Sequence, residues 1–172
     1  MVLQFEGRNQ ESPHAVNLVS DLDQASVRTH VVAADWQTAI TLAGDALVAG
    51  GVTTDEYTAE MIAAVDKLGP YIVIAPGLAI AHSRPSPAVL RAGLSWVSLT
   101  EPVRFGHKKN DPVSLVIGLA APDHEGHLEM MQALAGVLMN SELLAALKAA
   151  ASPAEVLTLM SNPELLTEKA LS

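Results

Sequence analysis

The apolar residues of this chain first recur at the spacing of amphipathic helices. From Asp35 to the Gly50-Gly51 pair, and again from Thr53 to Gly69-Pro70, they return every three or four residues. This period places them on one face of a helix. Asp35 can cap the first segment, Thr53 with Glu56 matches a capping box, and the glycines mark the ends. Two amphipathic helices are therefore predicted.

Five shorter runs are rich in apolar and β-branched residues and predict strands. They are Ser26–Val32, Tyr71–Ile74, Leu78–His82, Gly93–Leu99 and Pro112–Ala121. Pro76-Gly77 separates the second run from the third, as expected of a strand pair joined by a turn. The last run is apolar on both faces, which is typical of a central strand covered on both sides. The pattern indicates a layered α/β domain.

The C-terminal third returns to helical spacing. Apolar residues from Leu128 to Leu138 predict one helix, and Ser141 can cap a second that runs through Lys148. Ser152–Glu155 is a capping box with proline in the first turn. Shorter helices are expected at Ala15–Leu22 and after Asn162-Pro163.

Composition narrows the class of protein. The chain has 172 residues, 49% of them hydrophobic, enough for one globular domain over 1–172 with a loose segment at 1–14. It has no cysteine, which excludes thiol chemistry, disulfides and cysteine-ligated metal and fits a cytosolic protein. The longest apolar runs, such as Val113–Ala121, fall well short of the ~20 residues of a membrane span, so we expect a soluble chain.

The charge balance bears on partners. The net charge is -9, and the lysines and arginines are scattered apart from the short stretch Arg104–Lys109. No basic face is predicted for a phosphate backbone, which argues against nucleic acid as a partner and favours basic proteins.

His82 is the strongest candidate for chemistry, because it follows an almost uncharged apolar run. Arg84 comes two residues later and suits an anionic partner, while Pro85 and Pro87 prevent a helix from continuing. An imidazole held in this way can serve as a nucleophile or a base. A neutral imidazole has a free lone pair, so it can attack without a separate base.

Three segments, Gly69–Pro85, Phe105–Pro112 and the strand leading into Asp123–Leu128, carry a resemblance to a known family. The chain resembles the IIA components of the bacterial phosphoenolpyruvate-dependent sugar phosphotransferase system. Within the fructose-mannitol class it is most similar to the ascorbate-type branch. The resemblance extends roughly from Val31 to Met160.

The resemblance implies both a fold and an activity. The fold is a mixed sheet between helical layers, a three-layer α/β/α sandwich. The histidine matching His82 accepts a phosphoryl group from the phosphocarrier HPr and passes it to a cysteine of the matching IIB component. The membrane permease component IIC is then reached only indirectly. The histidine matching His127 lies beside the first and supports the phosphoryl group.

Phosphoryl transfer requires positioning and charge neutralisation, because its transition state is loose. Arg84, an N–H of His127 and backbone amides can supply these, and the Ser83 hydroxyl can add a hydrogen bond. Gly126–Leu128 is expected just before a helix, whose free N–H groups would bind phosphate. Ala79 and Ala81 suit an open site, and no metal or cofactor is required.

The sequence departs from the family pattern at two places. Ala81 and Ser83 stand where the family usually has proline and glycine around the active histidine. Mannitol-type relatives also carry an arginine on the preceding helix, whereas Ile62–Lys67 has none. Arg84 is the expected substitute, as in the His-x-Arg-Pro pattern of ascorbate-type relatives.

Two other functions remain open at this point. The same fold could act as a sensor that binds a kinase, transporter or transcription factor according to its phosphorylation state. A metal module could use His82, His124 and His127, although the spacing of His124 and His127 differs from that of zinc peptidases. The transported sugar and the oligomeric state, monomer or homodimer, are not determined by the sequence.

The remaining conspicuous side chains have ordinary structural interpretations. We expect His107 to be a loop residue and His14 and His30 to be incidental. The larger aromatic residues Tyr57, Trp36 and Trp96 are predicted to lie in the core.

Overall fold

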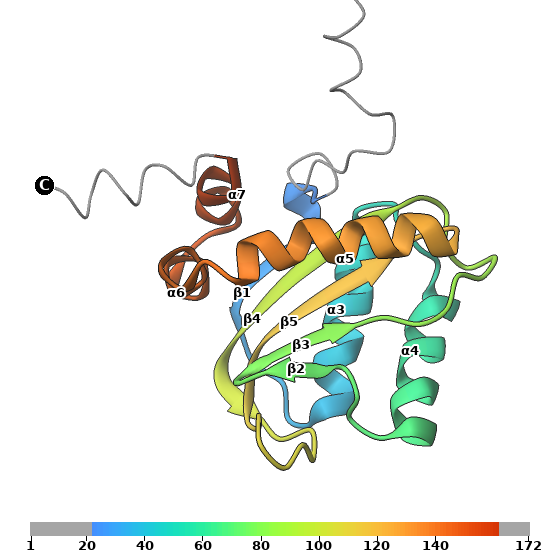
Figure 1. The fold of residues 1–172 in the computed structure, drawn as a ribbon, viewed down its shortest axis with the longest axis horizontal. Coiled ribbons are helices and arrows are strands. Elements are labelled where there is room, and N and C mark those ends of the chain that lie inside the picture. Colours follow the sequence, from blue (N-terminus) through green and yellow to red (C-terminus); the bar gives the residue numbers. More distant parts are fainter. Residues whose placement is uncertain (1–21, 162–172) are drawn as a thin grey trace, which may run out of the picture.

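A five-stranded mixed sheet forms the centre of the computed structural model, which describes residues 22–161 (Figure 1). Its strands are β1 (Val27–Val31), β2 (Val73–Ala75), β3 (Leu78–Ala81), β4 (Gly93–Val103) and β5 (Val113–Ala120). They lie in the order β1-β4-β5-β3-β2. The pairs β1–β4 and β3–β5 are parallel, whereas β4–β5 and β2–β3 are antiparallel. Every residue of β5 except Ser114 is buried, as predicted for a central strand.

Helices cover both faces of this sheet. They are α3 (Trp36–Ala49), α4 (Asp55–Leu68), α5 (His124–Leu138), α6 (Ser141–Ala149) and α7 (Pro153–Ser161), and a short 3-10 helix, η1 (Gln24–Ser26), precedes β1. Helices α3 and α4 share one hydrophobic core with Ala79 and Ala81 of β3. Helices α5, α6 and α7 share a second core with Leu78 and Ile80, because successive strand residues point to opposite faces. The predicted α/β/α sandwich with a mixed sheet is confirmed.

Capping side chains set several of the helix boundaries. The backbone N–H of Thr38 donates to the Asp35 carboxylate at 2.8 Å, which confirms the predicted start of α3. At α7 the N–H of Glu155 donates to the Ser152 hydroxyl at 3.2 Å. The Glu155 carboxylate accepts from the N–H of Ala151 at 3.1 Å, so the predicted capping box forms with its return bond displaced by one residue.

Two predicted caps are wrong by one residue. Thr54, and not Thr53, is the N-cap of α4, and its side chain makes no capping bond. Thr53 instead pairs with Val89 in an isolated bridge, which delays the start of the helix. Asn140, and not Ser141, caps α6, because its side-chain oxygen accepts from the N–H of Leu143 at 3.0 Å.

Two predicted elements are longer in the structure. Strand β4 continues past Leu99 to Val103, opposite the start of β5. Helix α5 begins at His124, so Gly126–Leu128 lies inside its first turns and not before it. The cause is Asp123, whose carboxylate accepts from the N–H of Gly126 at 2.7 Å and thereby starts the helix early.

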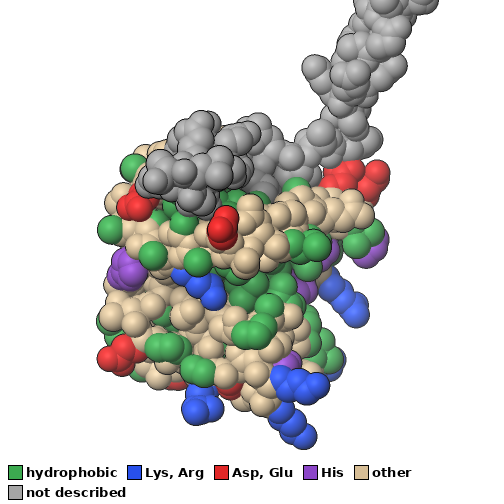
Figure 2. Space-filling model, turned by 60° about the vertical axis from the view of Figure 1, so that its left-hand side comes forward, with side chains coloured by type: hydrophobic (Ala, Val, Ile, Leu, Met, Phe, Trp, Pro, Cys, Tyr) green, Lys and Arg blue, Asp and Glu red, His purple; other side chains and the backbone are tan. Residues whose placement is uncertain are grey.

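Several predictions concern residues outside the described range. The loose segment at 1–14, all but the last residue of the helix at Ala15–Leu22, and the helix after Asn162-Pro163 fall there. Within residues 22–161 no single helix is long and apolar enough to span a membrane. The bent pair α5 and α6, at 91° to each other, passes the same test by length and composition alone. On the face drawn in Figure 2, acidic and basic side chains are scattered among apolar and uncharged ones.

Candidate functional site

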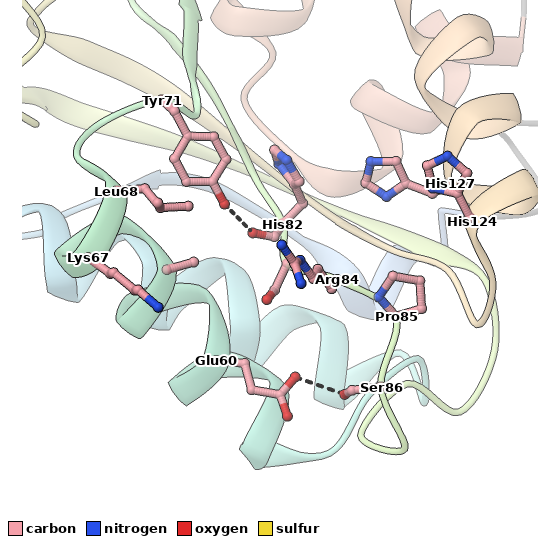
Figure 3. Close-up of a pocket in the computed structure, with 12 residues that line it drawn as sticks. Glu60, Lys67, Leu68, Tyr71, His82, Arg84, Pro85, Ser86, His124 and His127 are labelled. Atoms are coloured by element: carbon pink, nitrogen blue, oxygen red, sulfur yellow. Dashed lines mark hydrogen bonds between the residues drawn. The ribbon is translucent and has the colours of Figure 1, made fainter.

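A pocket of about 930 Å³ lies where β3 ends (Figure 3). Its lining comes from α4, from the turn between α4 and β2, from the segment that follows β3 and from the first turn of α5: Glu60, Ala64, Lys67, Leu68, Tyr71, His82, Ser83, Arg84, Pro85, Ser86, His124 and His127. Strands β3 and β5 are parallel, and Ala81 pairs with Gly118. Their carboxyl ends therefore meet at one edge of the sheet, which brings His82 and His127 together.

His82 presents one free ring nitrogen to this pocket. Its Nδ1 lies 2.8 Å from the carbonyl oxygen of Ile80. A carbonyl can only accept, so in the neutral ring Nδ1 carries the proton and donates it to Ile80. The lone pair is consequently on Nε2, which makes this nitrogen the one able to act as a nucleophile.

Two aromatic rings flank the His82 imidazole. The His127 ring centroid lies 5.3 Å from that of His82, with the ring planes at 55°. Tyr71 meets the His82 ring edge-on, with centroids 5.4 Å apart, and its hydroxyl donates to the His82 carbonyl at 3.3 Å. Tyr71 was not among the predicted site residues, because a tyrosine at the start of an apolar run carries no chemical signal of its own.

His127 is half-buried in the first turn of α5. Burial lowers its pKa, and the neighbouring His82 and His124 lower it further. The ring is therefore neutral at neutral pH and can donate a hydrogen bond from one nitrogen. The N–H groups of Gly126 and His127 are bonded to Asp123, which leaves those of His124 and Glu125 without a partner inside the helix. The amides available to an anion are thus different from those predicted.

Tyr57 has a role that the sequence analysis did not predict. The side chain is buried as expected, with 1% of its surface exposed. Its hydroxyl accepts from the N–H of Ser83 at 2.9 Å and lies 2.9 Å from the Leu119 carbonyl, to which it donates. Burial raises the pKa of Tyr57 to about 12, so the hydroxyl keeps its proton. The Tyr57 hydroxyl, carried by α4, thus links Ser83, directly after His82, to Leu119 near the end of β5.

The charged groups of the pocket come from two walls. Arg84 is exposed, and in the described part of the chain it has no hydrogen bond or ion pair. Lys67 lines the opposite side, so the stretch Ile62–Lys67 supplies a cation although it has no arginine. The Glu60 carboxylate accepts a hydrogen bond from the Ser86 hydroxyl at 2.8 Å.

The small residues around His82 behave differently from one another. Ser83, the predicted hydroxyl donor to phosphate, lines the pocket. Ala79 and Ala81 are instead fully buried under α3 and α4, so they do not form the rim of the site. They allow close packing of β3 against the helices, because neither adds more than a methyl group.

The remaining histidines that the structure describes do not assemble into a metal site. His124 lines the pocket, His107 lies in a loop where its Nδ1 accepts from the backbone of Lys109 and Asn110, and His30 is exposed on β1. His14 is outside the described residues. Within 22–161 no group of three or more histidine, aspartate or glutamate side chains could hold a metal ion. Of the predicted core aromatics besides Tyr57, Trp96 is fully buried and Trp36 packs half-buried against the core.

Known proteins share this fold and much of this sequence. The family model "Phosphoenolpyruvate-dependent sugar phosphotransferase system, EIIA 2" matches residues 21–162. The ascorbate-specific PTS system EIIA component of Escherichia coli (strain K12) is 37% identical over 141 residues, which are 81% of this chain and 92% of that protein. The residues that the family model matches include the whole described range.

Solved structures agree with the sequence comparisons. The mannitol-specific cryptic phosphotransferase enzyme IIA of Escherichia coli superimposes with a TM-score of 0.77 and 30% identity, covering 86% of this chain and 99% of that one. Enzyme IIA mannitol of Escherichia coli, solved in complex with phosphorylated enzyme IIB mannitol, gives a TM-score of 0.70 and 30% identity, covering 80% and 95%. The chain therefore belongs to the EIIA 2 family of the phosphoenolpyruvate-dependent sugar phosphotransferase system.

Proposed function

We propose that this protein carries a phosphoryl group on Nε2 of His82 between two partner proteins of the sugar phosphotransferase system. The observation that carries the proposal is the hydrogen bond from Nδ1 to the Ile80 carbonyl, 2.8 Å long, which leaves Nε2 as the free nucleophile. The pocket of about 930 Å³ around the ring gives partners access to that atom.

The transfer step needs no metal or separate base. The Nε2 lone pair attacks the phosphorus of a phosphohistidine on the donor, an N–P bond forms, and the donor nitrogen takes back the electron pair of the bond that breaks. The Nδ1 proton remains on the ring, where the Ile80 carbonyl stabilises the charge that the ring acquires. In the second half, a cysteine thiolate of the acceptor attacks the same phosphorus and His82 becomes neutral again.

Three neighbours stabilise the phosphoryl oxygens. Arg84 supplies a positive charge, which compensates the charge that is spread over the oxygens in a loose transition state. His127 donates one N–H, and it can take up a proton when the phosphoryl dianion arrives, because an anion nearby favours the charged imidazole. The Ser83 hydroxyl adds a hydrogen bond. His82 is thus the phosphoacceptor, with His127 and Arg84 as its catalytic partners.

The proposed donor is HPr and the proposed acceptor is the IIB component of an ascorbate-type permease, reached in the cytoplasm. Identity to the ascorbate-specific EIIA component supports the choice of permease. The complex of the mannitol IIA relative with phosphorylated IIB supports direct contact with such an acceptor. The permease component IIC would receive the phosphoryl group only through IIB.

Labelling with purified proteins tests the proposal. Enzyme I, HPr and radiolabelled phosphoenolpyruvate are expected to label the wild-type chain, with the label on His82 by mass spectrometry. His82→Ala should remain unlabelled, whereas His30→Asn, a change of an exposed side chain on β1, should be labelled normally. Label in His82→Ala would refute the assignment.

Discharge experiments separate transport from the regulatory alternative. The labelled protein is mixed with purified ascorbate-type or mannitol-type IIB, and the loss of label is followed with time. Rapid discharge by the ascorbate-type IIB alone is the expected result. Retention of the label with both would contradict the carrier role and favour a phosphorylation-dependent regulator.

A further inference from the structure

The segment Ser83–Ser86 is attached to α4 at both of its ends. At one end the N–H of Ser83 donates to the Tyr57 hydroxyl at 2.9 Å. At the other end the Ser86 hydroxyl donates to the Glu60 carboxylate at 2.8 Å. Tyr57 and Glu60 are three positions apart, so they lie on the same face of α4.

Arg84 lies between these two attachments. Its own side chain has no hydrogen bond or ion pair among residues 22–161, so only its backbone determines where the guanidinium can reach. Pro85 restricts that backbone further by limiting its own φ and the conformation of Arg84. The bond at Ser86 is what holds the far end of this short segment against the helix.

The geometry of the Glu60–Ser86 bond is well defined. The Ser86 oxygen also accepts from the N–H of Ala88 at 3.1 Å, so the hydroxyl proton is left to point at Glu60. Both side chains are half-buried, and a carboxylate acceptor makes the bond stronger than one between neutral groups. The negative charge of the Glu60 carboxylate repels a phosphoryl group in the same pocket. Its presence there is explained if Glu60 has another role that offsets this repulsion.

We propose that Glu60 is a positioning residue of the carrier site, which acts through Ser86 to hold Arg84 beside the phosphoryl group on His82. This inference rests on the proposed function. Glu60 itself touches no phosphoryl oxygen; its effect is on the placement of the guanidinium.

The inference is tested by phosphoryl transfer from labelled HPr, with the reaction quenched at successive times and over a range of HPr concentrations. Each variant then gives a maximal transfer rate and a half-saturating HPr concentration. Glu60→Ala should lower the maximal rate about tenfold, because misplacing one charged group weakens transition-state stabilisation. The half-saturating concentration should change less than about twofold, since the donor surface is unaltered. Glu60→Gln keeps an oxygen acceptor and should restore the rate to within about threefold of wild type. Glu56→Ala is the matched control, an exposed glutamate of the same helix, and should leave the rate unaltered.

A double-mutant comparison identifies Arg84 as the intermediary. In an Arg84→Ala background, adding Glu60→Ala should change the rate by less than about twofold, because nothing is left to position. A full tenfold further loss in that background would overturn the inference, and so would a wild-type rate in Glu60→Ala alone. Ser86→Ala provides a second disruption of the same bond, with circular dichroism to check folding. An unlabelled wild-type protein would instead refute the carrier function itself, so the two failures are distinguishable.

Discussion

The Tyr57 hydroxyl offers the sharpest test of how this site is assembled, and removing it in Tyr57→Phe leaves the ring in place. The hydroxyl accepts from the Ser83 N–H at 2.9 Å and lies 2.9 Å from the Leu119 carbonyl and 3.2 Å from the Ser83 carbonyl. Since the phenyl ring still fills its buried position, the change creates no large cavity. The expected loss in the free energy of unfolding is therefore that of the lost hydrogen bonds alone.

The size of that cost can be worked out from burial. A buried donor or acceptor left without a partner costs ~1–3 kcal/mol, and the Tyr57 hydroxyl serves one of each. We therefore expect Tyr57→Phe to lower the free energy of unfolding by about 1–3 kcal/mol. Ser83, which loses its bond to the hydroxyl, directly follows His82, so we also expect slower labelling by HPr.

Urea unfolding, monitored by circular dichroism, measures the change in the free energy of unfolding. The slope of this free energy with urea concentration is expected to be the same in Tyr57→Phe and in the wild type. Tyr71→Phe is the matched control, because the Tyr71 hydroxyl is on an exposed side chain and its bond to the His82 carbonyl is 3.3 Å long. That variant should lose less than about 0.5 kcal/mol. A loss of similar size in both variants, or none in Tyr57→Phe, would refute the assigned role of the buried hydroxyl.

Three further predictions concern tautomer, pH and packing. Nitrogen-15 NMR of His82 should show the proton on Nδ1 in the free protein and phosphorus on Nε2 after labelling; a proton on Nε2 would contradict the assignment. Because the pKa of His127 is lowered in the folded protein, the unfolded chain binds the proton more readily. The contribution of His127 to the free energy of unfolding is therefore fully present above the ordinary histidine pKa of ~6.5, and it declines as the pH falls below that value. His127→Asn should flatten that decline in urea titrations, and an unchanged slope would count against it. Gly118→Ala should lower the free energy of unfolding by about 1–3 kcal/mol, because the new methyl group would overlap the Ser95 hydroxyl. Gly136→Ala places its methyl group in open space on a helix and should raise the free energy of unfolding by up to ~1 kcal/mol. Thermal melts in which both variants shift in the same direction would be inconsistent with this packing.

Much of the fold could be predicted because the relevant signals are local. Apolar spacing located α3 and α4, and the side chain of Asp35 marked where α3 begins. The error at the start of α4 arose because a distant segment competes for the same backbone. Thr53 matches a cap by sequence, yet its pairing with Val89 keeps it out of the helix. No pattern within the helix itself reveals that bridge.

The candidate site divides in the same way. His82, Ser83 and Arg84 are adjacent in the chain, so one motif was enough to single them out, and the family resemblance added His127. The contacts of Tyr71 and Tyr57 at the site were not predicted, because a tyrosine looks the same in the sequence whether it only fills the core or also contacts the site.

The sequence by itself determined the helices, the strands and the histidine that follows β3, because spacing, caps and turns act over a few residues. Only the tertiary structure decided what surrounds that histidine. The parallel pairing of β3 and β5 brings the ends of both strands to one edge, and α4 packs beside it. Tyr57 and Glu60 reach the segment after His82 from that helix, since hydrogen bonds between distant residues depend on how whole elements pack and not on local order.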